Sequence, residues 1–179
     1  DWEYMVNCFV IFAKVGFHFI HTENGDPNVV LTQCGSDIGP VAVQVDASQS
    51  HAGLAFSNCQ LMAQVIINKR NKGPVKFSNC GFWGISTTDH QAQIDGSGIA
   101  IFTSCHFSGW ARVNPESAAI VGHGGKLILN GCEFLDENKN HVKLEENVLS
   151  AAIVGNHFTG GAKIENLSKG KVEIGLNVE

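Results

Sequence analysis

The chain has 179 residues, of which 44% are hydrophobic and 16% are charged, and its formal net charge is −5. This composition supplies the core of one ordinary globular domain and excludes a disordered chain. The mild negative charge and a single short basic stretch, NKRNKG at 68–73, argue against a nucleic-acid partner. A membrane partner is not expected either, because no run approaches the ~18 apolar residues of a membrane-spanning helix.

The six cysteines mark a repeat that runs through the whole chain. Successive members are 21 to 27 residues apart, and Asn156 takes the matching place in AAIVGNHFTGG; the cysteines are Cys8, Cys34, Cys59, Cys80, Cys105 and Cys132. A period near 25 residues indicates a repeat architecture, in which each unit stacks on its neighbours.

Each repeat contains three short runs in which apolar and polar residues alternate, as they do in strands. In the repeat around Cys59 these runs are VAVQVDAS (41–48), GLAFSN (53–58) and CQLMA (59–63). Helical repeats would need longer stretches with a period of 3.6 residues. We therefore predict an all-β fold, a right-handed parallel β-helix of about seven rungs with three short strands per rung.

The residue before each column position is expected to form a bend with positive φ. These residues are Asn7, Gln33, Asn58, Asn79, Ser104, Gly131 and Gly155. Gly and Asn tolerate a left-handed backbone best, so Gln33 and Ser104 fit this position less well. The cysteines then point inward as free, buried thiols; a disulfide scaffold is the alternative, but stacked strands direct their side chains in parallel. No Cys-x-x-Cys pair exists to suggest zinc.

A second column lies two residues after the first and is expected to fill the core. It contains Val10, Leu61, Phe82, Phe107, Phe134 and Phe158. Stacked aromatic and aliphatic side chains would form a ladder along the β-helix. Trp83 and Trp110 lie close behind this column, where an indole either stacks on a sugar or is buried under a loop.

The units VKFSNCGFWG (75–84) and YMVNCFVIFAKVGFHFI (4–20) resemble those of the pectate-lyase-like right-handed β-helix superfamily. The likeness is closest to its glycoside hydrolase family 28-related and pectate-lyase-3-type branch, and it runs from about Tyr4 to Val178. Members include polygalacturonases, polysaccharide lyases, epimerases and phage tailspike depolymerases. The resemblance implies an extracellular or cell-surface protein whose partner is an extended polysaccharide, and an activity of the glycoside hydrolase or polysaccharide lyase type.

The resemblance also places the working surface on one set of strands. These are VGFHFIHT (15–22), VAVQVDAS (41–48), QVIINK (64–69), AQIDGS (92–97), AAIVGHGG (118–125), HVKLEEN (141–147) and AKIEN (162–166). The residues expected to face inward are Phe17, Phe19, Val43, Val45, Val65, Ile67, Ala92, Ile94, Val142, Leu144, Ala162 and Ile164. Those expected to face outward are His18, Gln44, Asp46, Asn68, Gln93, Asp95, Lys143, Glu145, Lys163 and Glu165.

On this outer surface, Asp46, Asn68 and Asp95 are expected to share one column on consecutive rungs. The two aspartates would then lie two rungs, or roughly 9.6 Å, apart, at the edge of the range of about 6.5–9.5 Å for inverting glycoside hydrolysis. We predict Asp46 and Asp95 as the catalytic general acid and base, and a polysaccharide bound by His18, Gln44, Asn68, Gln93 and His123. The alternative is a solvated exterior on which carboxylates line up.

Other features bear on the type of reaction. GHGG (122–125) and STTDHQ (86–91) only echo a polygalacturonase signature, because an Asp-Asp pair and a downstream Arg-x-Lys are missing. A lyase would need a base such as Lys69 or Arg70, and calcium could then assist it. The histidines show no metal-ligand spacing, so we expect no resident metal and no cofactor.

The alternative function is a non-catalytic β-helix spine for glycan binding, adhesion or a phage tailspike. The chain begins at Asp1 without an initiator methionine or a signal peptide, so we expect residues 1–179 to form a single β-helix domain that is a fragment, or the C-terminal part, of a longer protein. No capping helix is expected at either end, and a strand starts almost at once. A further segment or subunit is therefore expected to cover the N-terminal end.

Overall fold

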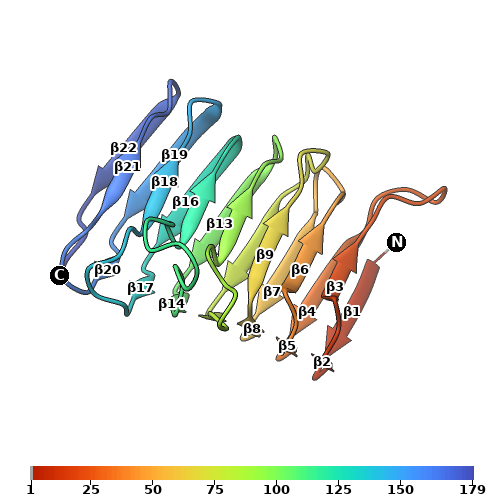
Figure 1. The fold of residues 1–179 in the computed structure, drawn as a ribbon. Helices are drawn as coiled ribbons and strands as arrows, with labels where there is room; N and C mark the ends of the chain where they lie inside the picture. The colour runs from red at the N-terminus through yellow and green to blue at the C-terminus, as the bar shows by residue number, and fades with distance from the viewer. Residues whose placement is uncertain (1) are drawn as a thin grey trace.

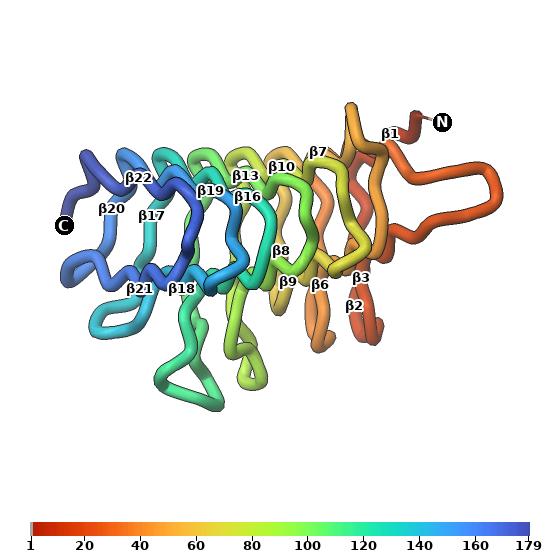
Figure 2. Tube along the Cα trace, turned by 90° about the horizontal axis from the view of Figure 1, so that it is seen from above, coloured from red at the N-terminus to blue at the C-terminus, as the bar shows by residue number. Residues whose placement is uncertain are grey.

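A computed structural model describes residues 2–179, which consist of β-strands and connecting segments. The strands form three parallel sheets wound around one elongated core, as Figures 1 and 2 show. Within the described residues there is no helix with the length and apolar character needed to span a membrane.

The three sheets run along the whole length of the molecule. Sheet A contains β1 (Trp2–Val6), β4 (Asn28–Thr32), β7 (Leu54–Ser57), β10 (Val75–Ser78), β13 (Ile99–Thr103), β16 (Gly125–Asn130), β19 (Val148–Val154) and β22 (Lys171–Gly175). Sheet B contains β2 (Phe9–Ile11), β5 (Gly35–Asp37), β8 (Gln60–Met62), β11 (Gly81–Trp83), β14 (His106–Ser108), β17 (Glu133–Phe134) and β20 (His157–Phe158). Sheet C contains β3 (Val15–Phe19), β6 (Val41–Val45), β9 (Gln64–Ile67), β12 (Ala92–Ile94), β15 (Ile120–Gly122), β18 (Val142–Leu144) and β21 (Ile164–Asn166).

Each rung contributes one strand to sheet A, then to sheet B, then to sheet C. Neighbouring rungs pair in parallel, so that Phe77 in β10 stands opposite Phe56 on one side and Phe102 on the other. Sheet A has eight strands and the other two sheets have seven each. The all-β, parallel β-helix fold with about seven rungs and three strands per rung is therefore confirmed.

The bend between sheets A and B has the predicted left-handed backbone in every rung. The φ angles are 55° at Asn7, 55° at Gln33, 54° at Asn58, 53° at Asn79, 52° at Ser104, 62° at Gly131 and 70° at Gly155. Gln33 and Ser104 adopt the same conformation as the better-suited residues, so the stacking of the rungs overrides their local preference. Leu176, with φ of 55°, forms one further bend that the sequence did not reveal.

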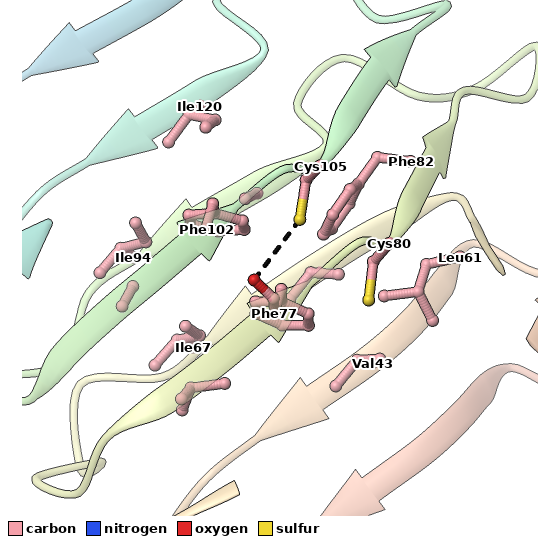
Figure 3. Close-up of a cluster of buried hydrophobic side chains, with 14 of the residues drawn as sticks. Val43, Leu61, Ile67, Phe77, Cys80, Phe82, Ile94, Phe102, Cys105 and Ile120 are labelled. Atoms are coloured by element: carbon pink, nitrogen blue, oxygen red, sulfur yellow. Dashed lines mark hydrogen bonds between the residues drawn. The ribbon is translucent and has the colours of Figure 1, made fainter. Parts of the chain in front are cut away.

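The cysteine column forms a ladder of thiols inside this bend. Each of the five buried thiols donates to a carbonyl of the preceding rung: Cys80 Sγ lies 3.5 Å from Phe56 O, and Cys105 Sγ lies 3.5 Å from Phe77 O (Figure 3). All six cysteines are free; five are buried and Cys8 is half-buried. Contact with the thiol of Cys105, together with burial, raises the pKa of Cys80 to about 12. Free thiols are thus confirmed, and Cys80 is unreactive at neutral pH.

Asparagine takes over the ladder at the C-terminal end. Asn156 Nδ2 donates to Leu129 O at 3.0 Å, which is the bond that a cysteine makes in earlier rungs. Asn177 continues the column, because its Nδ2 donates to Ile153 O at 3.0 Å and its Oδ1 accepts from the backbone N–H of Asn156 at 2.9 Å. The place of Asn156 in the column is confirmed, and Asn177 is an additional member.

Two stacks of phenylalanine rings fill the core with the spacing of the rungs. The predicted stack has ring centroids 4.7 Å apart for Phe82 and Phe107, 4.7 Å for Phe107 and Phe134, and 4.8 Å for Phe134 and Phe158. Phe56, Phe77 and Phe102 of sheet A form the second stack, and Figure 3 shows Phe77 and Phe102 beside Phe82. In the second rung the column is continued by the buried Ser36.

The last rung of sheet C is shifted by two residues from the prediction. Ile164 pairs with Val142, and Glu165 pairs with Lys143. The side chain of Ala162, expected to face inward, is exposed, and Lys163 precedes the strand. The connection before β21 contains Gly160 (φ 80°) and Gly161 (φ 91°), both with a left-handed backbone, and the strand begins only at Ile164.

The bend conformation predicts a test at Gly131. A Cβ added there would have Ser104 Oγ as its nearest neighbour at 3.7 Å, so the site has room for a side chain. The positive φ alone should make Gly131→Ala destabilising by about 1 kcal/mol, and Gly131→Asn less so. Urea unfolding measures both. Gly175→Ala, where the added Cβ meets nothing within 4 Å, is the matched control; an equal loss there would contradict the bend explanation.

A buried histidine predicts how stability depends on pH. His141 is fully buried, its Nδ1 accepts from the N–H of Lys163 at 3.0 Å, and its Nε2 has no hydrogen-bond partner among residues 2–179. Burial lowers the pKa of His141 from 6.5 to about 4. Between these pH values the unfolded chain binds a proton that the folded chain does not, so acidification costs about 3 kcal/mol of unfolding free energy.

Replacement of this histidine should remove that part of the pH dependence. In His141→Asn, Oδ1 can keep the bond to Lys163 while the titratable group is lost. The unfolding free energy of wild type minus that of the variant, measured from pH 7 to pH 4, should fall by about 3 kcal/mol as the pH falls, because only the wild type loses stability through this group. His51→Asn, at an exposed position, should show no such trend. A pH-independent difference for His141→Asn would contradict the burial of an uncharged imidazole.

Candidate functional site

The predicted column of Asp46, Asn68 and Asp95 lies at the turn that follows sheet C. The register aligns Val45 with Ile67 and Ile67 with Ile94, so the residues after them stack on consecutive rungs. The backbone continues the ladder there: the N–H of Asn68 donates to Val45 O and that of Asp95 donates to Ile67 O, both at 2.8 Å. The two aspartates are therefore two rungs apart, with Asn68 between them.

Asp46 collects side chains from three rungs. His18 Nε2 lies 2.8 Å from Asp46 Oδ2, and Gln44 Nε2 donates to Asp46 Oδ1 at 3.1 Å. The amide of Asn68 donates to the same oxygen from the next rung. Although burial acts to raise it, these hydrogen bonds from Asn68, His18 and Gln44 leave the pKa of Asp46 below its ordinary value. Asp46 is consequently held as a carboxylate.

Asp95 has a similar but smaller set of partners. Gln93 Nε2 donates to Asp95 Oδ2 at 2.9 Å, and His123 Nδ1 lies 2.6 Å from Asp95 Oδ1. Gln93 is itself held by Gln64, whose Nε2 donates to Gln93 Oε1 at 3.3 Å. The structure thus gathers the predicted residues into two groups, His18, Gln44 and Asn68 around Asp46, and Gln93 and His123 around Asp95. Whether they bind or react with a polysaccharide stays a prediction.

Three neighbouring clefts lie over the two groups. One cleft of about 420 Å³ is lined by Ile20, His21, Asp26, Asp46, Ala47, Ser48, Arg70 and Lys72. A second, of about 310 Å³, is lined by Asp46, Asn68, Lys69 and Arg70. A third, of about 580 Å³, is lined by Lys69, Asp95, Ser97, His123, Gly124, Gly125, Asn147 and Leu149. Shared walls at Asp46, Lys69 and Arg70 join them into one surface, here called the groove.

The connection between β9 and β10 supplies the positive charge of the groove. Lys69, Arg70 and Lys72 are exposed and make no ion pair within residues 2–179. This turn is fixed from below, because the buried Asn71 accepts from Ser48 Oγ at 2.8 Å and donates to Gly73 O at 2.9 Å. Lys69 and Arg70 are the residues named above as candidates for a lyase base; both line a cleft with Asp46, and Lys69 also lines a cleft with Asp95.

The segment between β3 and β4 adds a third histidine–aspartate pair to the groove, which the sequence did not reveal. His21 Nδ1 lies 2.8 Å from Asp26 Oδ1, and both residues line the first cleft. The segment extends beyond the N-terminal end of the β-helix (Figure 2). His18 and His21, three residues apart, contact different aspartates, so they do not converge on one point.

The remaining outward residues of sheet C lie at the C-terminal end and form ion pairs. Lys143 Nζ lies 3.2 Å from Glu145 Oε1 and 3.6 Å from Glu165 Oε2. These side chains are substantially exposed, and such pairs contribute little to stability. This part of sheet C is a solvated exterior.

Among residues 2–179, no group of three or more His, Cys, Asp or Glu side chains is arranged to hold a metal ion. Calcium needs oxygen ligands at about 2.3–2.6 Å, whereas Asp46 and Asp95 are separated by two rungs, or roughly 9.6 Å. A single calcium ion therefore does not fit between them.

No protein-family model, curated protein or solved structure matches this chain.

The partners of Asp46 predict how its carboxyl group titrates. Asp46 should be half-protonated below pH 3.8, its ordinary value, because three donors favour the charged form. Carbon-detected NMR titration of the carboxyl groups measures this directly. Asn68→Ala removes one donor and should raise the apparent pKa. Gln93→Ala removes a matched amide that donates to Asp95 and not to Asp46, so the pKa of Asp46 should stay unchanged; an Asp46 pKa at or above its ordinary value in the wild type would refute this description.

Proposed function

We propose that this chain is a carbohydrate-active β-helix protein that acts on an extended polysaccharide, by hydrolysis or elimination, in the groove. The observation that carries the proposal is the elongated groove itself, in which two carboxylates lie two rungs apart and point to the same side. A groove that follows the β-helix axis suits a linear polymer better than a compact ligand.

The different surroundings of the two aspartates suggest their roles in hydrolysis. Asp46 is held in the charged form, so it would take a proton from water, whose oxygen then attacks the anomeric carbon. Asp95 would give a proton to the leaving glycosidic oxygen, as the acid of an inverting pair does. His18, Gln44, Asn68, Gln93 and His123 would hold sugar hydroxyls or position the carboxylates.

The basic turn supports elimination as the alternative reaction. Lys69 and Arg70 lie in the clefts beside Asp46, and Lys69 also lies beside Asp95. An uncharged lysine could remove the proton next to a uronate carboxylate, while arginine neutralises that carboxylate. Because a calcium ion does not fit between the aspartates, no step is assigned to it.

A non-catalytic spine for glycan binding, adhesion or a tailspike is the second candidate function. One observation favours it: the carboxylates of the groove are occupied by hydrogen bonds within the protein, and the pKa of Asp46 is lowered. A catalytic acid or base usually has a pKa tuned towards the operating pH, and the pKa of Asp46 is shifted away from it. Asp46 and Asp95 would then only accept hydrogen bonds from sugar hydroxyls.

We further propose a pectate-lyase-like origin and an extracellular or cell-surface location, on the strength of the repeat units. At the N-terminal end the side chains of Trp2 (73% exposed), Tyr4 (69%) and Phe12 (74%) are open to solvent. Within residues 2–179 the outer edge of β1 has no strand partner. An exposed apolar edge invites association, so a further segment or subunit is proposed to cover it.

A panel of polysaccharides tests the function. Reducing-end release would identify a hydrolase, and ultraviolet absorbance of an unsaturated product would identify a lyase. On the polymer that is cleaved, Asp46→Asn and Asp95→Asn should each lower the rate by about 100-fold or more, because proton transfer is lost.

Glu173→Gln is the matched control, since Glu173 lies on sheet A away from the groove and is exposed. It should keep the full rate. Cleavage that persists in both aspartate variants would refute the assignment of these residues. Binding without any cleavage would favour the spine.

A further inference from the structure

A second polar and aromatic cluster lies on the outer face of sheet B, away from the groove. Gln60, Gly81 and His106 stand opposite one another on three consecutive rungs. Gly81 has no side chain, and its neighbours fill the space above it. A Cβ added at Gly81 would lie 2.4 Å from Gln60 Oε1, 2.7 Å from His106 Nε2 and 2.7 Å from Trp83 Nε1.

These contacts hold the indole of Trp83 across Gly81. Trp83 Nε1 donates to Gln60 Oε1 at 2.6 Å. The imidazole of His106 meets the indole edge-on, with ring centroids 5.1 Å apart and an interplanar angle of 77°. The side chain nevertheless stays 38% exposed. Trp110 differs, because it is fully buried and donates to Asn140 O at 2.8 Å.

We propose that Trp83, with Gln60 and His106, forms a binding site for one pyranose ring of a neutral glycan. An indole fixed at its edges offers an apolar surface to the C–H groups of a sugar ring. The Gln60 amide nitrogen and the His106 ring make no hydrogen bond to other groups within residues 2–179, so they remain free for sugar hydroxyls. This site does not depend on the function of the groove.

The charge of the surrounding surface selects a neutral sugar. The strands GSD, QLM, GFW, HFS and EF, which form β5, β8, β11, β14 and β17, contain neither lysine nor arginine. Glu133 follows His106 in the register and is exposed. On these strands an anionic sugar would find no cation and would meet a carboxylate. The cation closest along the fold is Arg112, whose Nε donates to Gly109 O at 2.9 Å, beyond the end of β14. The groove, with Lys69, Arg70 and Lys72, has the opposite character.

The indole N–H signals of the protein report on this site directly. The three tryptophans give three such signals in a ¹H–¹⁵N NMR spectrum, and single substitutions assign them. Titration with cellohexaose, maltohexaose, mannohexaose and trigalacturonate should shift the Trp83 signal with at least one neutral oligosaccharide and not with trigalacturonate. Trp83→Ala should weaken binding of that oligosaccharide about tenfold or more, because stacking is lost.

Gly81→Ala is the sharper variant, and Trp2→Ala is its control. The new Cβ would collide only with the ends of flexible side chains, so the rung should fold while the indole is displaced. Binding should weaken as in Trp83→Ala, and circular dichroism should show an unchanged fold. Trp2→Ala, at an exposed residue of sheet A, should bind normally. The proposal is overturned if no neutral hexasaccharide shifts the Trp83 signal, or if Gly81→Ala binds as the wild type does.

Discussion

The fold depends on one constraint, the in-register parallel pairing of each strand with the same strand of the next rung. Backbone hydrogen bonds fix the rung spacing at about 4.8 Å, so each side chain lies directly on its counterpart. The phenylalanine rings adopt this spacing, with centroids 4.7 to 4.8 Å apart in the Phe82 stack. At the bend the column must hold small side chains, and thiols fit because each can donate to the carbonyl of the rung before it.

The same constraint shapes the candidate site. Carboxylates on adjacent rungs would lie about one strand spacing apart and repel each other. Asn68 occupies the rung between Asp46 and Asp95, and its amide donates to Asp46. The column therefore alternates charge with a hydrogen-bond donor, and a separation of two rungs between the carboxylates follows from the stacking. This separation is close to the one needed for inverting glycoside hydrolysis. It results from β-helix geometry alone, so a surface that only binds a ligand would show the same separation.

The periodic features could be predicted from the sequence, because the same pattern recurs in several repeats. The cysteine column, the bends and the sharing of one column by Asp46, Asn68 and Asp95 all follow from counting residues. Prediction failed at the C-terminal end: the register of β21 is shifted by two residues, and neither Asn177 nor the bend at Leu176 was foreseen. The position of Lys69, Arg70 and Lys72 in the groove depends on how the turn between β9 and β10 folds over the buried Asn71. No pattern in the sequence reveals this fold of the turn.

A prism with three sheets separates surfaces of different chemistry on one short chain. The groove lies where sheet C turns into sheet A, and it combines carboxylates with Lys69, Arg70 and Lys72. Sheet B carries an indole over a glycine, and its strands β5, β8, β11, β14 and β17 contain no basic residue. Both surfaces run parallel to the axis of the β-helix on different sides of it. A linear polymer that follows one surface therefore does not contact the other. Under the two proposals, each surface would select its own sugar, because the two surfaces differ in charge.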